Sequence, residues 1–424
     1  MSESKPLPSL TPPRTLRERL IKVGPGFVVA ATSVGAPDLL ASIVVGQTYG
    51  MTFLWAIILG AVFKYYLNEG VGRWHLGTGR TIIDGWQSLG KWATGYFGIY
   101  AMIWGLVYGA TAAMASGMAM NAIWPVLPIW GWALIHAVAA FLLVFSGRYQ
   151  LFEKIMTVFV ALMFLSIIGT ACLFLPSIGE VARGLVPTVP KGSLFLALGL
   201  IGGVGGTITM ASYGYWIREK NWTNKSWIPM MKVDAGTGYV ITCIFCTAAL
   251  IIGAQFLFGQ SIDIHGDAGY IAMAQLLGER FGQPLRWTFL IAFWSAVYSS
   301  LLGVWNGVPY LFADFVRTIR LKKGREPEKA TVSEKDPAYR FFLFWLTFPP
   351  MLIYFIGKPI ELIFIYGALG SLFMPFLAVT LTILLNSRTL AADVRNRWWT
   401  NVILGACILM FVILGVNELI GLIE

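Results

Sequence analysis

The sequence contains few charged residues. Asp, Glu, Lys and Arg make up 12% of the 424 residues, whereas hydrophobic residues make up 57%. Soluble domains carry about twice that share of charge. The mean hydropathy is +0.70, and apolar runs recur over the whole length. These values exclude a soluble globular protein and a protein with a single anchor, and they indicate an integral membrane protein.

Cysteine and histidine are also scarce, with four and three copies. Cys243 and Cys246 form a C-x-x-C inside an apolar run, which favours small buried thiols over a metal or redox pair, and no disulfide is expected. His136 lies in an apolar run and is expected to be buried and hydrogen-bonded. The sequence contains no nucleophile–base pair, no His-rich metal cluster and no phosphate-binding loop. We therefore expect neither an enzyme nor a cofactor.

The hydropathy pattern predicts an all-α polytopic membrane protein. Residues 1–24 form a polar cytoplasmic segment without the apolar core of a cleavable signal, and residues 25–424 form one transmembrane domain. Each predicted span is long enough to cross a hydrocarbon core of ~30 Å. The eleven predicted spans are 25–48, 51–71, 95–123, 129–146, 151–176, 194–217, 234–258, 285–316, 341–357, 359–386 and 398–422.

The distribution of basic residues predicts the orientation. With the N-terminus in the cytoplasm, the inner segments hold 25 of the 31 Lys and Arg residues and the outer segments hold five. This bias follows the positive-inside rule and places the C-terminus outside. The net charge of +10 is therefore an orientation signal and not a nucleic-acid footprint. The remaining basic residue, Lys64, lies within the second span.

The first apolar run is interrupted near its middle, where residues 35–38 read GAPD. Pro37 has no N–H to donate and crowds the preceding turn, and Gly35 relaxes the backbone, so the helix should break there. Asp38 places a carboxylate inside the span, where a charge by default indicates a functional site. The alternative is that Asp38 only caps the second half of the helix.

The sixth span contains a second interruption, because residues 199–215 read GLIGGVGGTITMASYGY. So many glycines weaken a helix by about 1 kcal/mol each relative to Ala. The run does not have the spacing of a dinucleotide fingerprint and follows no strand. Close helix packing through small residues is the alternative, but hydroxyls and a thioether follow the glycines directly, which favours an unwound segment.

The two interrupted spans lie five spans apart, an odd number, so the second set of five would be inverted relative to the first. That arrangement is typical of inverted-repeat transporters, which bind a small solute between two broken helices. The predicted repeats are 25–176 and 194–386, with an extra helix at 398–422. Exposed carbonyls together with the Asp38 carboxylate favour a cation as that solute.

Four stretches resemble the NRAMP family of divalent-metal transporters. Residues 24–30 (GPGFVVA), 152–155 (FEKI), 299–303 (SSLLG) and 371–376 (SLFMPF) are similar to family motifs. The resemblance extends over nearly the whole hydrophobic chain. It implies eleven or twelve spans, a LeuT-like inverted five-plus-five repeat, and proton-coupled import of manganese or iron.

The resemblance weakens at the metal site. The family reads D-P-G-N in the first span, where this chain has Gly35-Ala36-Pro37-Asp38, so the carboxylate has moved. The family motif of the sixth span, A-x-x-M-P-H, aligns in two frames. If Met210 matches the methionine, a thioether favours manganese or iron, and Thr207 supplies the carbonyl. If Thr209 matches, the site offers only oxygen and Gly206 supplies the carbonyl, as suits a hard ion in the related magnesium transporters.

Proton coupling has little support in the sequence. The histidine of the sixth-span motif is replaced, and residues 95–123 contain no charged residue where the family's proton route has charges. Lys64 and Glu69 in the second span are expected to snorkel or to pair structurally rather than to carry protons.

The sequence therefore predicts a secondary transporter of a divalent cation, of the Mn/Fe or Mg class, working by alternating access in a bacterial inner membrane. The ion is a substrate and not a resident cofactor; lipid is the other expected partner, and the oligomeric state is not predicted. A same-fold transporter of an amine or amino acid is the alternative, with Asp38 pairing with the amine. The candidate metal ligands are Asp38, Gly35, Gly206, Thr207, Thr209, Met210 and Ser212.

Overall fold

The computed structural model describes residues 11–24, 26, 34–147, 149–203, 205–258, 269–320, 332–355 and 359–421, and these contain helices and no strand. Each predicted span coincides with one of the helices, except that α10 and α11 together cover the sixth and that α3 covers the first only from residue 36 onward, since residues 27–33 lie outside the described residues. The α-helices are α1 (Leu16–Ile21), α3 (Ala36–Tyr49), α4 (Leu54–Thr78), α5 (Ile82–Ser88), α6 (Lys91–Ile123), α7 (Ile129–Phe145), α8 (Tyr149–Ala171), α9 (Ile178–Gly184), α10 (Leu194–Gly203), α11 (Tyr213–Glu219), α12 (Ile228–Ile252), α13 (Gly269–Phe281), α14 (Gln283–Arg320), α15 (Pro337–Thr347), α16 (Pro359–Leu385) and α17 (Trp398–Gly421).

Six helical segments of the described chain are long and apolar enough to cross a membrane, and three further apolar helices are shorter. Proline explains one irregular span. Helix α15 ends at Thr347, directly before Pro349 and Pro350, and the chain continues as a 3-10 helix to Phe355. Proline lacks the N–H that the next α-helical turn needs, so the tighter helix replaces it. The predicted ninth span therefore consists of α15 followed by a 3-10 helix.

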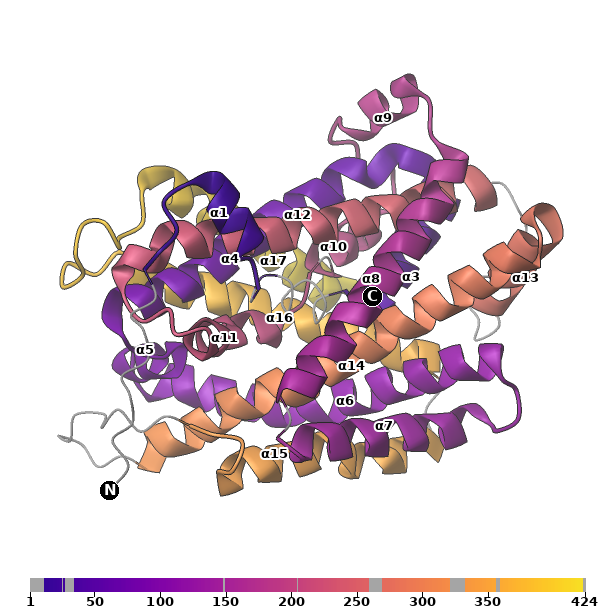
Figure 1. Cartoon of the computed structure of the whole chain (residues 1–424). Helices are drawn as coiled ribbons and strands as arrows, with labels where there is room; N and C mark the ends of the chain where they lie inside the picture. The colour runs from indigo at the N-terminus through magenta and orange to yellow at the C-terminus, as the bar shows by residue number, and fades with distance from the viewer. Residues whose placement is uncertain are drawn as a thin grey trace.

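Helices α6, α7 and α15 run nearly parallel to one another, whereas α8 crosses them at a steep slant (Figure 1). Helix α14 contacts α6, α8 and α15, while α12 contacts α3 and α4. Helices α5 and α11 lie at one end of the bundle together with α1, and α9 and α13 lie toward the opposite end. The segment between α10 and α11, which carries the second predicted break, contacts both α14 and α4.

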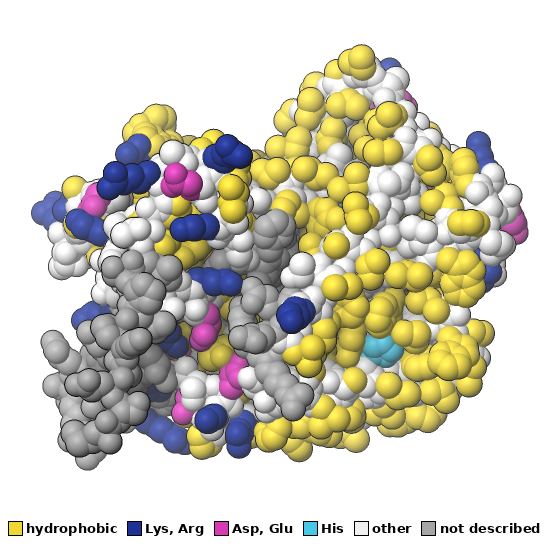
Figure 2. Space-filling model, in the orientation of Figure 1, with side chains coloured by type: hydrophobic (Ala, Val, Ile, Leu, Met, Phe, Trp, Pro, Cys, Tyr) yellow, Lys and Arg dark blue, Asp and Glu magenta, His cyan; other side chains and the backbone are white. Residues whose placement is uncertain are grey.

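Lys and Arg side chains gather mainly at the end of the bundle that carries α1, α5 and α11, which we call the basic end (Figure 2). Hydrophobic side chains cover most of the remaining visible surface. Side chains such as Ile99, Ile103 and Leu165 are more than half exposed. An apolar outer belt of this kind is what lipid contact requires, because lipid tails replace water around it.

His136 of α7 is held on both ring nitrogens, as the sequence predicts. Its Nδ1 lies 2.7 Å from the Trp132 carbonyl oxygen, and its Nε2 accepts a hydrogen bond of 2.8 Å from Trp294 Nε1. The hydrogen bond between His136 and Trp294 joins α7 to α14. Cys246 of α12 is a buried free thiol, as expected, whereas Cys243 is only partly buried.

Candidate functional site

The second half of the first span begins at the predicted break. Gly35 is the N-cap of α3 in an extended conformation, and its N–H donates a hydrogen bond of 2.9 Å to Asp38 Oδ2. Asp38 therefore does cap the helix, but its other oxygen, Oδ1, is buried and has no hydrogen-bond partner among the described residues. The carboxylate thus serves as a cap and still offers a ligand atom. Residues 27–33 of the same predicted span lie outside the described residues.

The predicted break in the sixth span is present between α10, which ends at Gly203, and α11, which begins at Tyr213. Gly205 and Gly206 have φ angles of +85° and +78°. This left-handed region is strained for residues that carry a Cβ, so glycine permits the chain to leave the helix here. A 3-10 turn over Ile208–Ser212 then leads into α11. The glycine run is therefore an unwound segment and not merely a packing face.

The two breaks face each other across an internal cavity of about 20 Å³. A space of roughly 10–15 Å³ suffices for one water molecule, so the cavity accommodates a water or a single small ion in this conformation. Helices α6, α14 and α16 complete its walls. The lining residues are Gly35, Asp38, Trp104, Tyr108, Thr111, Ala112, Ala115, Gly206, Thr207, Thr209, Val297, Ser300, Val304 and Tyr366.

Three oxygens in this lining are buried without a hydrogen-bond partner in the described chain: Asp38 Oδ1, Thr207 Oγ1 and Thr209 Oγ1. Such orphaned groups are costly, and several together at one cavity indicate a ligand that supplies what they lack. Carboxylate and hydroxyl oxygens suit hard cations. Among the described residues, no group of three or more His, Cys, Asp or Glu side chains is placed to hold a metal ion. Asp38 is the only charged side chain in the lining of this cavity, so it would be the only charged ligand there.

The predicted ligands divide into two groups. Gly35, Asp38, Gly206, Thr207 and Thr209 line the cavity, whereas the lining of the described chain does not include Met210 or Ser212. Ser212 Oγ instead donates to the Gly307 carbonyl oxygen at 3.1 Å, and Met210 is fully buried. The alignment frame that places Thr209 at the site is the frame consistent with this arrangement.

Lys64 is not among the predicted ligands, yet it lies beside the break in the sixth span. It was expected to snorkel or to pair, but it is 1% exposed, and its Nζ donates to the carbonyl oxygens of Gly202, at 2.8 Å, and of Gly206. The available signal is its position deep inside a predicted span, since the other basic residues lie in loops or, as Lys154 and Arg286 do, near the start of a span. Glu69, in contrast, does pair, with Arg73 at 3.0 Å.

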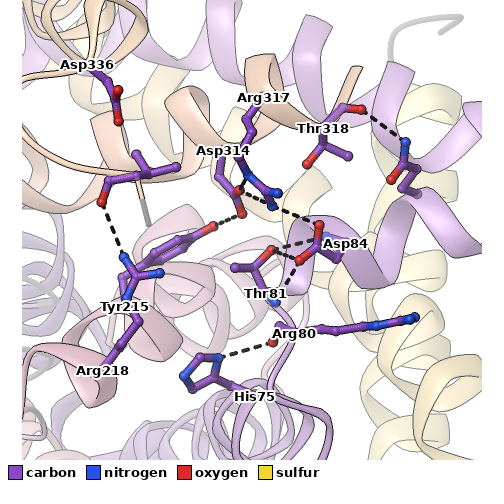
Figure 3. Close-up of polar contacts among 12 residues, drawn as sticks. His75, Arg80, Thr81, Asp84, Tyr215, Arg218, Asp314, Arg317, Thr318 and Asp336 are labelled. Carbon is purple, nitrogen blue, oxygen red and sulfur yellow. Dashed lines mark hydrogen bonds and ion pairs between the residues drawn. The ribbon is translucent and has the colours of Figure 1, made fainter. Parts of the chain in front are cut away.

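A polar network joins α5, α11 and α14 at the basic end (Figure 3). Arg317 of α14 contacts Asp314 at 2.6 Å and Asp84 of α5 at 2.9 Å. Tyr215 of α11 donates to the other oxygen of Asp314 at 2.6 Å. Asp314 is 1% exposed, and through it this buried network ties α11, the helix that follows the break, to α5 and α14.

Comparison with known proteins supports the resemblance seen in the sequence. The family model described as natural resistance-associated macrophage protein-like (Nramp) matches residues 26–421. The divalent metal cation transporter MntH of Staphylococcus saprophyticus is 24% identical over 425 residues, covering 94% of this chain and 91% of that protein. An uncharacterized protein of Pasteurella multocida is 22% identical and covers 75% of this chain and 76% of that protein.

Solved structures share the architecture. A mutant of the Eremococcus coleocola manganese transporter matches with a TM-score of 0.78 and 14% identity, covering 97% of this chain and 89% of that one. MhsT in complex with L-phenylalanine matches with a TM-score of 0.58 and 15% identity, covering 92% and 97%. The predicted LeuT-like all-α fold is therefore confirmed, and the described chain shows the break in the sixth span and the start of α3 at the predicted break of the first. Because the family match covers nearly the whole described chain, this protein belongs to the Nramp family.

Proposed function

We propose that this chain is a secondary transporter that moves a divalent cation across the membrane by alternating access. The observation that carries the proposal is the set of three unpartnered oxygens, from Asp38, Thr207 and Thr209, around one small cavity between two broken helices. Relatives named as divalent metal cation transporters support the same substrate class. Transport, and not catalysis, is the activity that such a site serves.

The proposed ligands are oxygen atoms. Asp38 Oδ1 supplies the charge, and the hydroxyls of Thr207 and Thr209 approach from the other break. A hard ion such as Mg²⁺ or Mn²⁺ would complete its shell with water, because these protein ligands are fewer than the six that octahedral coordination needs. The indole N–H of Trp104, which also lines the cavity and lacks a partner among the described residues, can donate to such a water.

The proposed orientation places the basic end in the cytoplasm of a bacterial cell. The support is the bias of Lys and Arg toward this end, which follows the positive-inside rule. We expect alkaline phosphatase fused after residue 424 to be active in the periplasm and a fusion after residue 390 to be inactive. The reverse pattern would require the opposite orientation.

We further propose that residues 25–176 and 194–386 are the two inverted repeats.

The decisive experiment is Mn²⁺ uptake into proteoliposomes that contain the wild-type chain or Asp38→Ala. We expect the substitution to abolish uptake, because it removes the only carboxylate among the cavity-lining residues. Excess Mg²⁺ should inhibit wild-type uptake strongly if the ligands are all oxygen. Uptake that survives Asp38→Ala would show that the ion binds outside this cavity. A correctly reconstituted wild type that transports no metal would refute the proposal.

A matched pair of variants tests the ligand set within the sixth-span break. Thr209→Val keeps the shape of the side chain and removes the hydroxyl, so we expect it to weaken Mn²⁺ and Mg²⁺ binding alike. Met210→Leu should leave both unchanged, since Met210 does not line the cavity. A selective loss of Mn²⁺ binding in Met210→Leu would instead establish the thioether as a ligand.

A small amine is the second candidate, because three aromatic rings line the cavity beside Asp38. Trp104 stacks on Tyr108 with ring centroids 4.6 Å apart, and Tyr366 lies 5.1 Å from Tyr108. Aromatic faces attract organic cations. The volume of about 20 Å³ excludes an amino acid in this conformation. Competition of methylammonium against Mn²⁺ would separate the candidates, since only a shared amine site predicts inhibition at low concentration.

A further inference from the structure

Lys64 is a buried ammonium in the middle of α4. Its side chain is among the largest that are fully buried, and it reaches the break in the sixth span. There it donates to the carbonyl oxygens of Gly202 and Gly206, which lie on either side of the end of α10. A long side chain that snorkelled would have placed its charge at the membrane surface. This one instead points its charge at the two broken helices.

Two local charges make that position favourable. The last carbonyls of α10 have no intrahelical partners, and the C-terminal end of a helix carries partial negative charge. The Asp38 carboxylate lines the same cavity as Gly206, whose carbonyl oxygen accepts the hydrogen bond from Lys64, so opposite charges lie on either side of this residue. Buried charges persist when they are paired and hydrogen-bonded. Lys64 therefore compensates the charge of Asp38 in the conformation described here.

The Gly206 backbone takes part both in the lining of the cavity and in the hydrogen bonding of Lys64. Gly206 lines the cavity next to Asp38, Thr207 and Thr209, and its carbonyl oxygen accepts the hydrogen bond from Lys64. A carbonyl held by an ammonium is a weakened ligand for a second cation. In addition, a divalent ion at Asp38 would experience repulsion from the Lys64 charge. The tethered ammonium and a bound cation thus compete for the same negative groups.

We propose that Lys64 is a built-in competitor of the transported cation, which occupies the negative end of the sixth-span break when the site is empty and must give way when the ion binds. The inference rests on the proposed function, since it concerns the affinity of that same site. Lys64 then sets the affinity: it keeps the empty site electrically neutral and restricts tight binding to ions that displace it. Lys64 is a specificity-determining residue in this account and not a ligand.

The test is Mn²⁺ binding to the purified full-length chain, measured by titration calorimetry at fixed pH. Lys64→Met removes the charge and the donors, and we expect it to bind Mn²⁺ at least about tenfold more tightly than wild type. Lys64→Arg keeps the charge and should show no gain. Lys64→Gln keeps an amide donor for the carbonyls without the charge, so it reports on the charge if Lys64→Met does not fold. Lys91→Met is the control for loss of one exposed positive charge.

The outcomes separate the inference from the proposed function. Tighter Mn²⁺ binding in Lys64→Met or Lys64→Gln, but not in Lys64→Arg or Lys91→Met, supports the inference that Lys64 competes with the ion. If wild type and the folded neutral variants bind Mn²⁺ equally, the site exists and the competition does not. Weaker binding in the neutral variants would show that Lys64 only stabilises the break, which also overturns the inference. If no variant binds Mn²⁺ or Mg²⁺, both the inference and the proposed function fail.

Discussion

Replacing Arg317 should destabilise the basic end more than replacing any exposed arginine there. Its guanidinium contacts two carboxylates from different helices, Asp314 at 2.6 Å and Asp84 at 2.9 Å (Figure 3). Arg317→Met leaves both carboxylates without this partner, and they then repel each other. Tyr215 still donates to Asp314, so one hydrogen bond of the network remains.

The magnitude follows from burial. Removing one partner of a buried ion pair costs about 3–5 kcal/mol, and a hydrogen bond to a charged group contributes about 1.5–3 kcal/mol. The side chains of Asp314, Asp84 and Arg317 are 1%, 9% and 18% exposed, so water offsets a part of the loss at Arg317. We therefore expect Arg317→Met to lower the free energy of unfolding by about 2–3 kcal/mol.

The assay is unfolding by sodium dodecyl sulfate in mixed micelles, followed by the fluorescence of the 17 tryptophans. Asp314→Asn combined with Arg317→Met should be less destabilised than the sum of the single variants, with a coupling of about 0.5–3 kcal/mol. Arg320→Met, an exposed position one turn farther along α14, is the control. The reasoning is refuted if Arg317→Met behaves like Arg320→Met, or if the two single effects simply add.

Two further predictions concern packing and use the same unfolding assay. A Cβ on Gly253 would collide with the Ile43 carbonyl oxygen of α3, so Gly253→Ala should cost about 1–3 kcal/mol. Gly405→Ala inside α17, with nothing within 4 Å, should instead stabilise by up to about 1 kcal/mol. Equal effects at the two glycines would contradict the close approach. His136→Leu leaves the Trp294 N–H without its acceptor and should cost about 1–3 kcal/mol, and a second substitution, Trp294→Phe, should relieve part of that loss. An additive double variant would show that the hydrogen bond contributes nothing.

Much of the fold could be predicted from the sequence. Hydropathy identifies the spans because a segment long enough to cross a membrane carries its signal in consecutive residues. The two breaks were also predictable, since proline and glycine act on the backbone at their own positions, as at Pro37 and at Gly205–Gly206. Asp38 was identified as a candidate ligand on the same local grounds.

The composition of the site was only partly accessible from the sequence. Two frames for the sixth-span motif stayed open because they differ by one residue, and a shift of one position in an irregular segment changes which side chain faces the cavity. The structure orients Thr209 toward the cavity and leaves Met210 outside its lining. The periodicities of α-helices and strands do not apply to a segment that unwinds at two glycines and continues as a short 3-10 turn.

The sequence by itself determined the class of protein, its helical spans, the places where two of them break and the carboxylate at the first break. Only the tertiary structure decided which distant groups meet there. Lys64 contacts carbonyls 138 and 142 residues away along the chain, and Arg317 reaches Asp84 across 233 residues. The physical reason is that hydropathy and backbone restriction are properties of consecutive residues, whereas the partner of a buried charge is set by how the helices pack.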